Sequence, residues 1–149
     1  MAQTFALQPL LELAQAEGDA AKTTLATLNR EIKLQDQKLV LLLNYREEYQ
    51  ERLRQRVTTG LDGGGLRNFN DFLDRLEQAV TKQQAVVVHA QARADAALKE
   101  WQIIQRKFKA FDKLSQRFDS SLRCREAKRD QKVQDDNASR RAIANAQRR

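Results

Sequence analysis

The sequence predicts an all-α protein, a long antiparallel two-helix coiled-coil hairpin, and three observations support that prediction. Charged residues make up 32% of the 149 positions and apolar residues 41%, with a single proline, Pro9. This composition favours long helices over sheets. Apolar residues also recur at steps of four and three through two segments, and four of the five glycines lie between those segments, within residues 60–65.

Residues 1–59 are predicted to form the first coiled-coil helix. Spacings of four and three keep one narrow apolar stripe on the same side of a helix, which is typical of coiled coils. Eleven of the fifteen positions in this stripe are apolar. The fifteen positions are Leu7, Leu11, Ala14, Gly18, Ala21, Leu25, Leu28, Ile32, Gln35, Leu39, Leu42, Arg46, Tyr49, Leu53 and Arg56.

Residues 60–67 are predicted to form a glycine-rich turn. Each glycine costs a helix about 1 kcal/mol relative to alanine, so both helices are expected to end there. Asn68 or Asn70 is then expected to cap the second helix, with Asp71 in its first turn. A phosphate-binding loop is not expected, because Leu66 and Arg67 follow the last glycine in place of Lys and Ser or Thr.

Residues 68–122 are predicted to form the second coiled-coil helix, which runs back along the first. Fourteen of its seventeen heptad positions are apolar. The seventeen positions are Phe69, Leu73, Leu76, Val80, Gln83, Val87, Ala90, Ala94, Ala97, Trp101, Ile104, Phe108, Phe111, Ser115, Phe118, Leu122 and Arg125. Both stripes belong to one chain, so an elongated monomer is expected.

Residues 123–149 are predicted to form a basic C-terminal extension that is partly helical or disordered. The net charge of the chain is +7. Residues 1–122 hold 18 Lys and Arg against 16 Asp and Glu, whereas residues 123–149 hold 9 against 4. The body is therefore nearly neutral and the extension is basic.

The sequence gives no indication of an enzyme, a cofactor or a metal site. His89 is the only histidine and has no cluster of carboxylates at ligand spacing. Cys124 is the only cysteine, so it cannot form an intramolecular disulfide, and a cytosolic location is expected. No signal peptide is recognised, and no apolar run approaches the roughly 18 residues of a membrane span.

Three roles remain compatible with a bare helical hairpin. It could be a rod that binds proteins through exposed patches and its ends. It could be an adaptor whose basic tail binds nucleic acid, since clustered Lys and Arg contact phosphates, although the tail has no aromatic residue for base stacking. A membrane-surface helix fits least well, because the tail carries few bulky apolar residues besides Val133 and Ile143.

The chain resembles the flagellar FliJ family of the bacterial type III export apparatus. The resemblance rests on the opening "MAQ" and "AL", on "LLLNYREEYQ" at 41–50, on the glycine-containing turn, and on "FLDRLEQAV" at 72–80. It runs from residue 1 to about 130, and the length, the turn position, the paired tyrosines and the basic tail make it more specific than heptads alone.

The resemblance implies a coiled coil similar to the rotor stalk of rotary ATPases. It implies that the chain inserts into the hexameric ring of the flagellar export ATPase and promotes ring assembly and ATP hydrolysis. It also implies contacts with the cytoplasmic domain of the membrane export gate and with export chaperones. The expected location is therefore cytoplasmic, peripheral to the cell membrane through partners, and no nucleic acid is expected.

The resemblance also implies two groups of site residues. The export-gate patch carries over to Leu42, Tyr45, Tyr49, Phe72, Leu76 and Ala79. With a turn near residues 60–65, antiparallel heptad spacing places Leu42 near Val80, Tyr45 near Leu76 and Tyr49 near Phe72, so the six patch residues are expected to form one strip. Lys38 and Gln83 depart from the residues that the family tends to have beside this patch. The end that binds the ATPase ring is expected to comprise Leu10, Leu11, Phe118, Arg123, Arg125, Lys128, Arg129 and Lys132.

Overall fold

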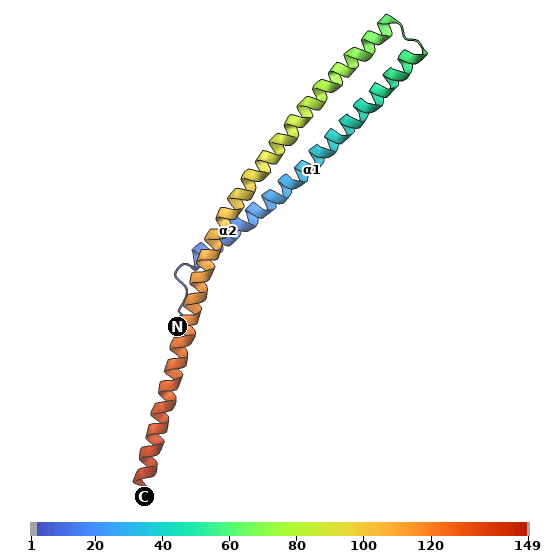
Figure 1. The fold of residues 1–149 in the computed structure, drawn as a ribbon. Helices are drawn as coiled ribbons and strands as arrows, with labels where there is room; N and C mark the ends of the chain where they lie inside the picture. Colours follow the sequence, from blue (N-terminus) through green and yellow to red (C-terminus); the bar gives the residue numbers. More distant parts are fainter. Residues whose placement is uncertain (1–2, 149) are drawn as a thin grey trace. The chain divides into compact units, whose positions relative to one another are not determined.

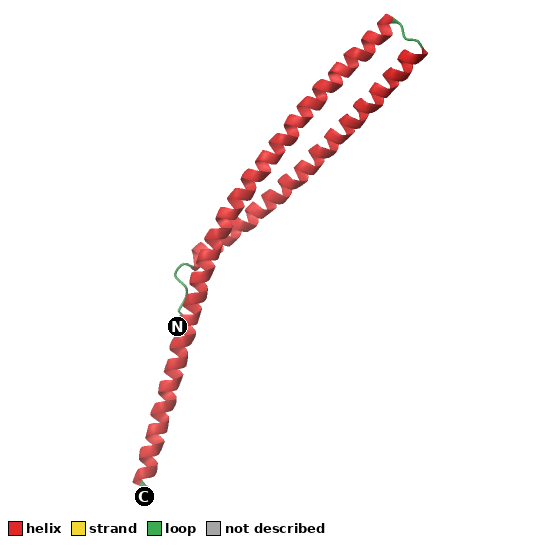
Figure 2. Ribbon diagram, in the orientation of Figure 1, coloured by secondary structure: helices red, strands yellow, loops and turns green. Residues whose placement is uncertain are grey.

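Two long helices make up nearly all of the computed structural model, which describes residues 3–148. Helix α1 spans Gln8–Thr59 and helix α2 spans Gly63–Gln147 (Figure 1). Within the described residues there is no strand (Figure 2). The predicted all-α helical hairpin is therefore confirmed. The first predicted helix includes residues 1 and 2 and the predicted extension includes residue 149, which lie outside the described residues.

The chain divides into two compact units, and each contains part of both helices. One unit comprises residues 18–103, and the other comprises residues 1–17 together with 104–149. They are called here the turn unit and the terminal unit.

In the turn unit, α1 and α2 run antiparallel on either side of a short connection (Figure 1). The helices pack through the predicted stripes. The most buried side chains of this unit are Gln35, Leu76, Val80, Val87, Ala90 and Ala94. Val80 is only 2% exposed and marks the centre of the packing.

The heptad pattern predicted the seam between the helices in both units. Of the fifteen positions in the first stripe only Arg56 is exposed, and of the seventeen in the second only Arg125 is exposed. Arg56 lies in the last turn of α1, next to the connection, and Arg125 lies two helical turns beyond Phe118. The predicted seam positions are thus exposed only at one end of each stripe, where a long cationic side chain can extend into solvent.

The connection between the helices is shorter than predicted, because α2 begins at Gly63 and not at residue 68. Asp62 caps the helix: its Oδ1 accepts the Gly65 N–H at 2.7 Å and its carbonyl accepts the Leu66 N–H at 3.0 Å. The prediction that Asn68 or Asn70 caps the helix is therefore wrong. The glycines tolerate the first helical turn because a well-placed carboxylate satisfies one of its free N–H groups.

Gly60 and Gly65 make different contributions to the turn. Gly60 has φ of +105°, which L side chains rarely adopt, and it directly follows the last residue of α1. This position favours glycine at helix C-termini. A Cβ added to Gly65 would lie 2.7 Å from Cδ1 of Leu61, so the Leu61 side chain packs over a position that only glycine leaves free.

In the terminal unit, the segment before α1 packs against α2. Phe5 contacts Phe118 with ring centroids 5.6 Å apart, and the Phe5 carbonyl accepts the Gln8 N–H at 3.0 Å as the helix begins. Leu11 and Ala14 are buried. Helix α2 continues to Gln147, so the extension predicted as partly helical or disordered is helical, and every described residue from 123 onward is exposed.

Candidate protein-interaction sites

An aromatic cluster lies beside the seam of the turn unit. Phe72 contacts Tyr49 with ring centroids 4.4 Å apart and meets Tyr45 edge-on at 6.1 Å. Phe69 contacts Tyr49 from the next turn of α2 at 5.1 Å. Tyr45 is 47% exposed, while the other three rings are half-buried. These rings therefore pack against one another and still present an apolar surface to solvent.

The predicted export-gate patch includes three of these aromatic residues and three aliphatic ones. Heptad spacing predicted Tyr49 near Phe72, and the structure confirms this contact. Leu42 and Ala79 are half-buried. Leu76 is only 7% exposed and belongs to the core, so it supports the patch from below and contributes little of its surface.

The surface beside the cluster continues toward the turn. Tyr49, Phe69 and Arg52 line an open groove together with residues near the end of α1. The heptad pattern predicted Phe69 as a seam residue only. Its second function, as part of the aromatic cluster, follows from the ring stacking with Tyr49 and could not be read from the heptad pattern.

A polar layer crosses the seam one heptad from Leu76. The Gln83 side-chain amide donates to Oε1 of Gln35 at 2.8 Å and to the Gln35 main-chain carbonyl at 3.0 Å. Gln35 in turn donates to Oε1 of Glu31 at 3.0 Å. Gln35 is 9% exposed, and no buried polar side-chain atom in the described residues lacks a partner. Sequence reasoning noted both glutamines at seam positions and missed that they pair.

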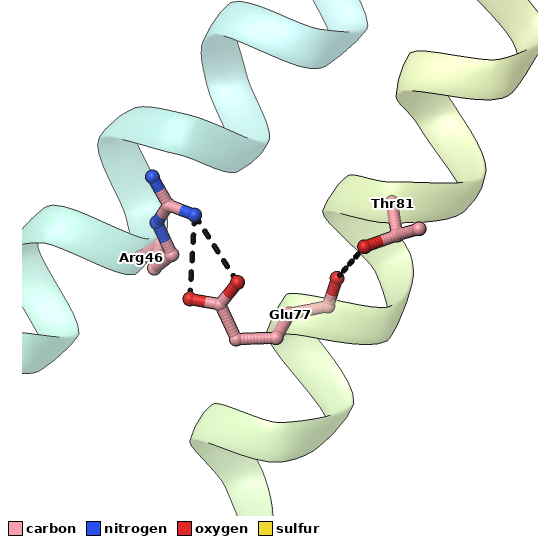
Figure 3. Close-up of polar contacts among 3 residues, drawn as sticks. All are labelled: Arg46, Glu77 and Thr81. Atoms are coloured by element: carbon pink, nitrogen blue, oxygen red, sulfur yellow. Dashed lines mark hydrogen bonds and ion pairs between the residues drawn. The ribbon is translucent and has the colours of Figure 1, made fainter.

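An ion pair spans the opposite edge of the seam. Nη1 of Arg46 lies 3.2 Å from one carboxylate oxygen of Glu77 and 3.3 Å from the other, and the Glu77 carbonyl accepts a hydrogen bond from Thr81 Oγ1 (Figure 3). The Arg46 side chain is 31% exposed and that of Glu77 50%. A pair so exposed contributes about 0–1 kcal/mol, and it closes this edge of the seam with polar groups.

The residues predicted to bind the ATPase ring all lie in the terminal unit. Leu11 is buried and Phe118 is half-buried against Phe5, whereas Leu10 is 44% exposed. The predicted cations lie on α2 beyond the last seam residue, and all are exposed: Arg123, Arg125, Lys128, Arg129 and Lys132. This part of the terminal unit is a helix whose cations are free to meet a partner.

The described residues contain no grouping of three or more His, Cys, Asp or Glu side chains that could hold a metal ion. His89 is exposed, and the Cys124 thiol is free and exposed. Neither described helix is long and apolar enough to cross a membrane.

Comparison with known proteins identifies the relatives of this chain. The family model described as "Flagellar FliJ protein" matches residues 3–147. A flagellar FliJ protein from Salmonella typhi is 29% identical over 143 residues, which cover 96% of this chain and 97% of the relative. The flagellar FliJ protein of Escherichia coli strain K12 is 27% identical with the same coverage. No solved structure matches the chain significantly. The match over nearly the whole length shows that the chain belongs to the flagellar FliJ protein family.

Proposed function

We propose that this chain is a non-enzymatic stalk of the bacterial flagellar protein export apparatus. It binds the hexameric export ATPase ring, promotes ring assembly and ATP hydrolysis, and links the ring to the cytoplasmic domain of the export gate and to export chaperones. It acts in the cytoplasm and reaches the cell membrane only through these partners. Membership of the FliJ family supports a component of the export apparatus, and the surfaces described above support the individual contacts.

The observation that carries the proposal is the exposed aromatic surface beside a complete seam. The two helices already bury one stripe each, so the core does not require Tyr45 or Ala79. Aromatic residues that remain exposed next to a polar surface are enriched in protein interfaces. The patch of Leu42, Tyr45, Tyr49, Phe72 and Ala79, supported by Leu76, is the proposed gate site.

The exposed cations of the terminal unit are the proposed contact with the ATPase ring. Arg123, Arg125 and Lys128 lie beyond the seam, where α2 has no apolar stripe to bury. Their charges stay hydrated in the free protein and can pair with acidic side chains on docking. Such pairs contribute about 0–1 kcal/mol each, so Leu10 and Phe118 of the same unit supply the apolar part of the contact.

The test compares two functions with two sets of variants. ATP hydrolysis by the export ATPase is measured with the wild-type chain and with Arg123→Glu/Arg125→Glu, and binding to the gate domain is measured with Phe72→Ala/Ala79→Asp. We expect the first variant to lower stimulation without abolishing it and to leave gate binding unchanged. The second variant should show the reverse pattern. Each variant therefore serves as the control for the other.

The alternative function is an adaptor with a nucleic-acid-binding tail. The exposed cations of residues 123–147 are the observation that favours it, and Asp135 and Asp136 within the same helix oppose it. Binding of duplex and single-stranded nucleic acid is measured alongside ATP hydrolysis. Unchanged stimulation, combined with tight and steeply salt-dependent nucleic-acid binding that Arg123→Glu/Arg125→Glu removes, would replace the stalk by this adaptor.

A further inference from the structure

The seam of the turn unit has two unlike edges. On each helix, the heptad places two positions on one side of the seam and two on the other, and antiparallel packing brings like sides together. The contact of Tyr45 with Phe72 marks one edge, and the pair of Arg46 with Glu77 marks the other. The first is called here the aromatic face and the second the acidic face.

The two faces differ in composition over the same length, residues 31–46 of α1 and 72–86 of α2. On the aromatic face, heptad spacing places six apolar residues: Leu34, Leu41, Tyr45, Phe72, Ala79 and Val86. It adds three cations, Lys38, Arg75 and Lys82, and one acid, Glu31, whose carboxylate accepts a hydrogen bond from Gln35 at 3.0 Å. The acidic face carries three acids, Asp36, Asp74 and Glu77, and two cations, Lys33 and Arg46, of which Arg46 pairs with Glu77. Only the aromatic face is both apolar and basic.

The aliphatic residues of the aromatic face are exposed well beyond the predicted gate patch. Leu41 is 68% exposed, Leu34 is 47% exposed and Val86 is 42% exposed. They do not belong to the seam, whose positions on these segments are already buried or half-buried. An exposed apolar strip that continues along two helices and is not part of the core indicates a binding surface.

We propose that the aromatic face is the docking surface for an amphipathic α-helix of a protein partner that carries acidic residues on its flanks. The apolar strip receives the apolar side of that helix, while Lys38, Arg75 and Lys82 pair with its acids. The strip covers residues 34–45 of α1, about 17 Å at 1.5 Å per residue, which suits about three turns of a docked helix. The inference rests on the proposed function of the patch, which it extends by Leu34, Leu41 and Val86.

The charge of the aromatic face decides between possible occupants. In a symmetric dimer, a second copy of the chain would bring the same three cations against themselves, and like charges across an interface disfavour association. The acidic face of a second copy is a weak alternative, because its Glu77 is already paired with Arg46. The partner must therefore supply acids. A helix meets this requirement with the least distortion, because its side chains at every third or fourth position form a ridge that fits between two packed helices.

The experiment measures binding of the full chain to two kinds of probe. One is the cytoplasmic domain of the export gate. The other is a pair of synthetic helical peptides with the same leucine stripe, one flanked by glutamates and one by lysines. We expect the wild-type chain to prefer the glutamate-flanked peptide, with an affinity that falls as salt is added. It should bind the gate domain through the same face.

Three variants assign the binding to the face. Leu34→Ser/Leu41→Ser/Val86→Ser should weaken binding about tenfold, a typical effect of losing central apolar contacts. Lys38→Glu/Arg75→Glu/Lys82→Glu should reverse the peptide preference. Val40→Ser/Val88→Ser is the matched control, because both valines are exposed and lie outside the aromatic face, so binding should not change. Circular dichroism checks each fold, and Leu41→Ser alone replaces the triple variant if that variant loses helicity.

The outcomes separate this inference from the proposed function. In one outcome, the gate domain fails to bind while the chain still prefers the glutamate-flanked peptide and binds it through Leu41. That result would support the docking surface and contradict its assignment to the gate. If the gate domain binds through Phe72 while the Leu41 and lysine variants have no effect, the extension is overturned and the gate site stands. Equal binding of both peptides, Leu41-dependent binding to anionic vesicles, or a Leu41-dependent dimer would each overturn the acidic helix as occupant.

Discussion

At the residue scale, a few side chains have functions that their neighbours in the heptad do not share. Phe72 illustrates this, because it lies one position outside the predicted stripe and is held between Tyr45 and Tyr49. Its ring therefore packs against the two tyrosine rings and also contributes to the exposed aromatic surface. A residue of this kind explains how a narrow coiled coil can present a rigid aromatic surface without a third helix to carry it.

The pair of Gln35 and Gln83 gives a prediction at the same scale. Gln83→Ala leaves Oε1 of the buried Gln35 without its donor, so we expect a loss of about 1–3 kcal/mol in the free energy of unfolding. Gln84→Ala, at the exposed neighbouring position, should change it by less than about 0.5 kcal/mol. Urea denaturation followed by circular dichroism measures both.

Replacing both glutamines tests what the pair contributes besides stability. Gln35→Leu/Gln83→Leu exchanges the polar layer for an apolar one, which is nearly neutral or stabilising for a pair removed together. A polar pair in a seam also favours one register, because other registers leave its groups unpaired. The double variant should therefore be at least as stable as the wild type. A loss as large as that of Gln83→Ala would show that the site cannot accept two leucines.

At the scale of the element, the turn shows how unlike the four glycines are. Gly60→Ala forces an L residue to φ of +105°, so we expect it to lower the free energy of unfolding by about 1–2 kcal/mol. Gly64→Ala is the matched control, because a Cβ there meets nothing within 4 Å and alanine favours the helix. It should raise stability by about 0.5–1 kcal/mol. Thermal melts of the two variants should therefore move in opposite directions.

The helical elements could be predicted from the sequence far better than their ends. Apolar spacing predicted the seam, because the residues that face the partner helix are the ones that become buried. Which residues share that face follows from the 3.6 residues per helical turn. The start of α2 was predicted too late, because propensity counts the cost of Gly63, Gly64 and Gly65 and takes no account of the cap that Asp62 supplies. The helical state of residues 123–147 could not be predicted, since they have neither a seam nor a helix-breaking residue.

The site was predictable to a similar extent. Spacing correctly placed Tyr49 against Phe72, because opposite residues of an antiparallel pair follow from the position of the turn. It could not show that Gln83 reaches the backbone of Gln35, since this contact depends on how close the helices approach. The predicted partner residues themselves remain predictions that binding experiments must test.

The last stretch of α2 gives a second prediction for an element. Residues 123–147 form a helix in which every residue is exposed, so this segment lacks the tertiary packing that supplies most helical stability in proteins. We expect its amides to exchange with solvent far faster than those of residues 76–94, which include the most buried positions of α2. Hydrogen exchange followed by mass spectrometry measures both segments in one sample. Equal protection would show that the extension has a partner within the molecule or in a second copy.

At the scale of the whole molecule, the two proposed binding surfaces belong to different units. The exposed cations beyond Leu122 lie in the terminal unit, whereas the aromatic face lies in the turn unit. The chain can therefore bind two partners with different chemistry, one mainly by charge and one by apolar contacts that cations flank. Raising the salt concentration is expected to weaken the first contact more than the second.

The association state gives the last prediction, because it depends on the whole chain. Both stripes of the seam come from one chain, and only residues 60–62 separate the two helices, so the intramolecular partner is always at high effective concentration. We therefore expect a monomer of 17.2 kDa at micromolar concentrations, measured by sedimentation equilibrium. The control replaces all five residues that bend or cap the turn with alanine, namely Gly60, Asp62, Gly63, Gly64 and Gly65. Alanine favours a continuous helix through this segment, which would separate the two stripes and leave each to pair with a second copy. The control variant should shift toward twice the monomer mass. A wild-type chain that is already a dimer would show that pairing between copies competes with the turn, and that the seam is not satisfied within one chain.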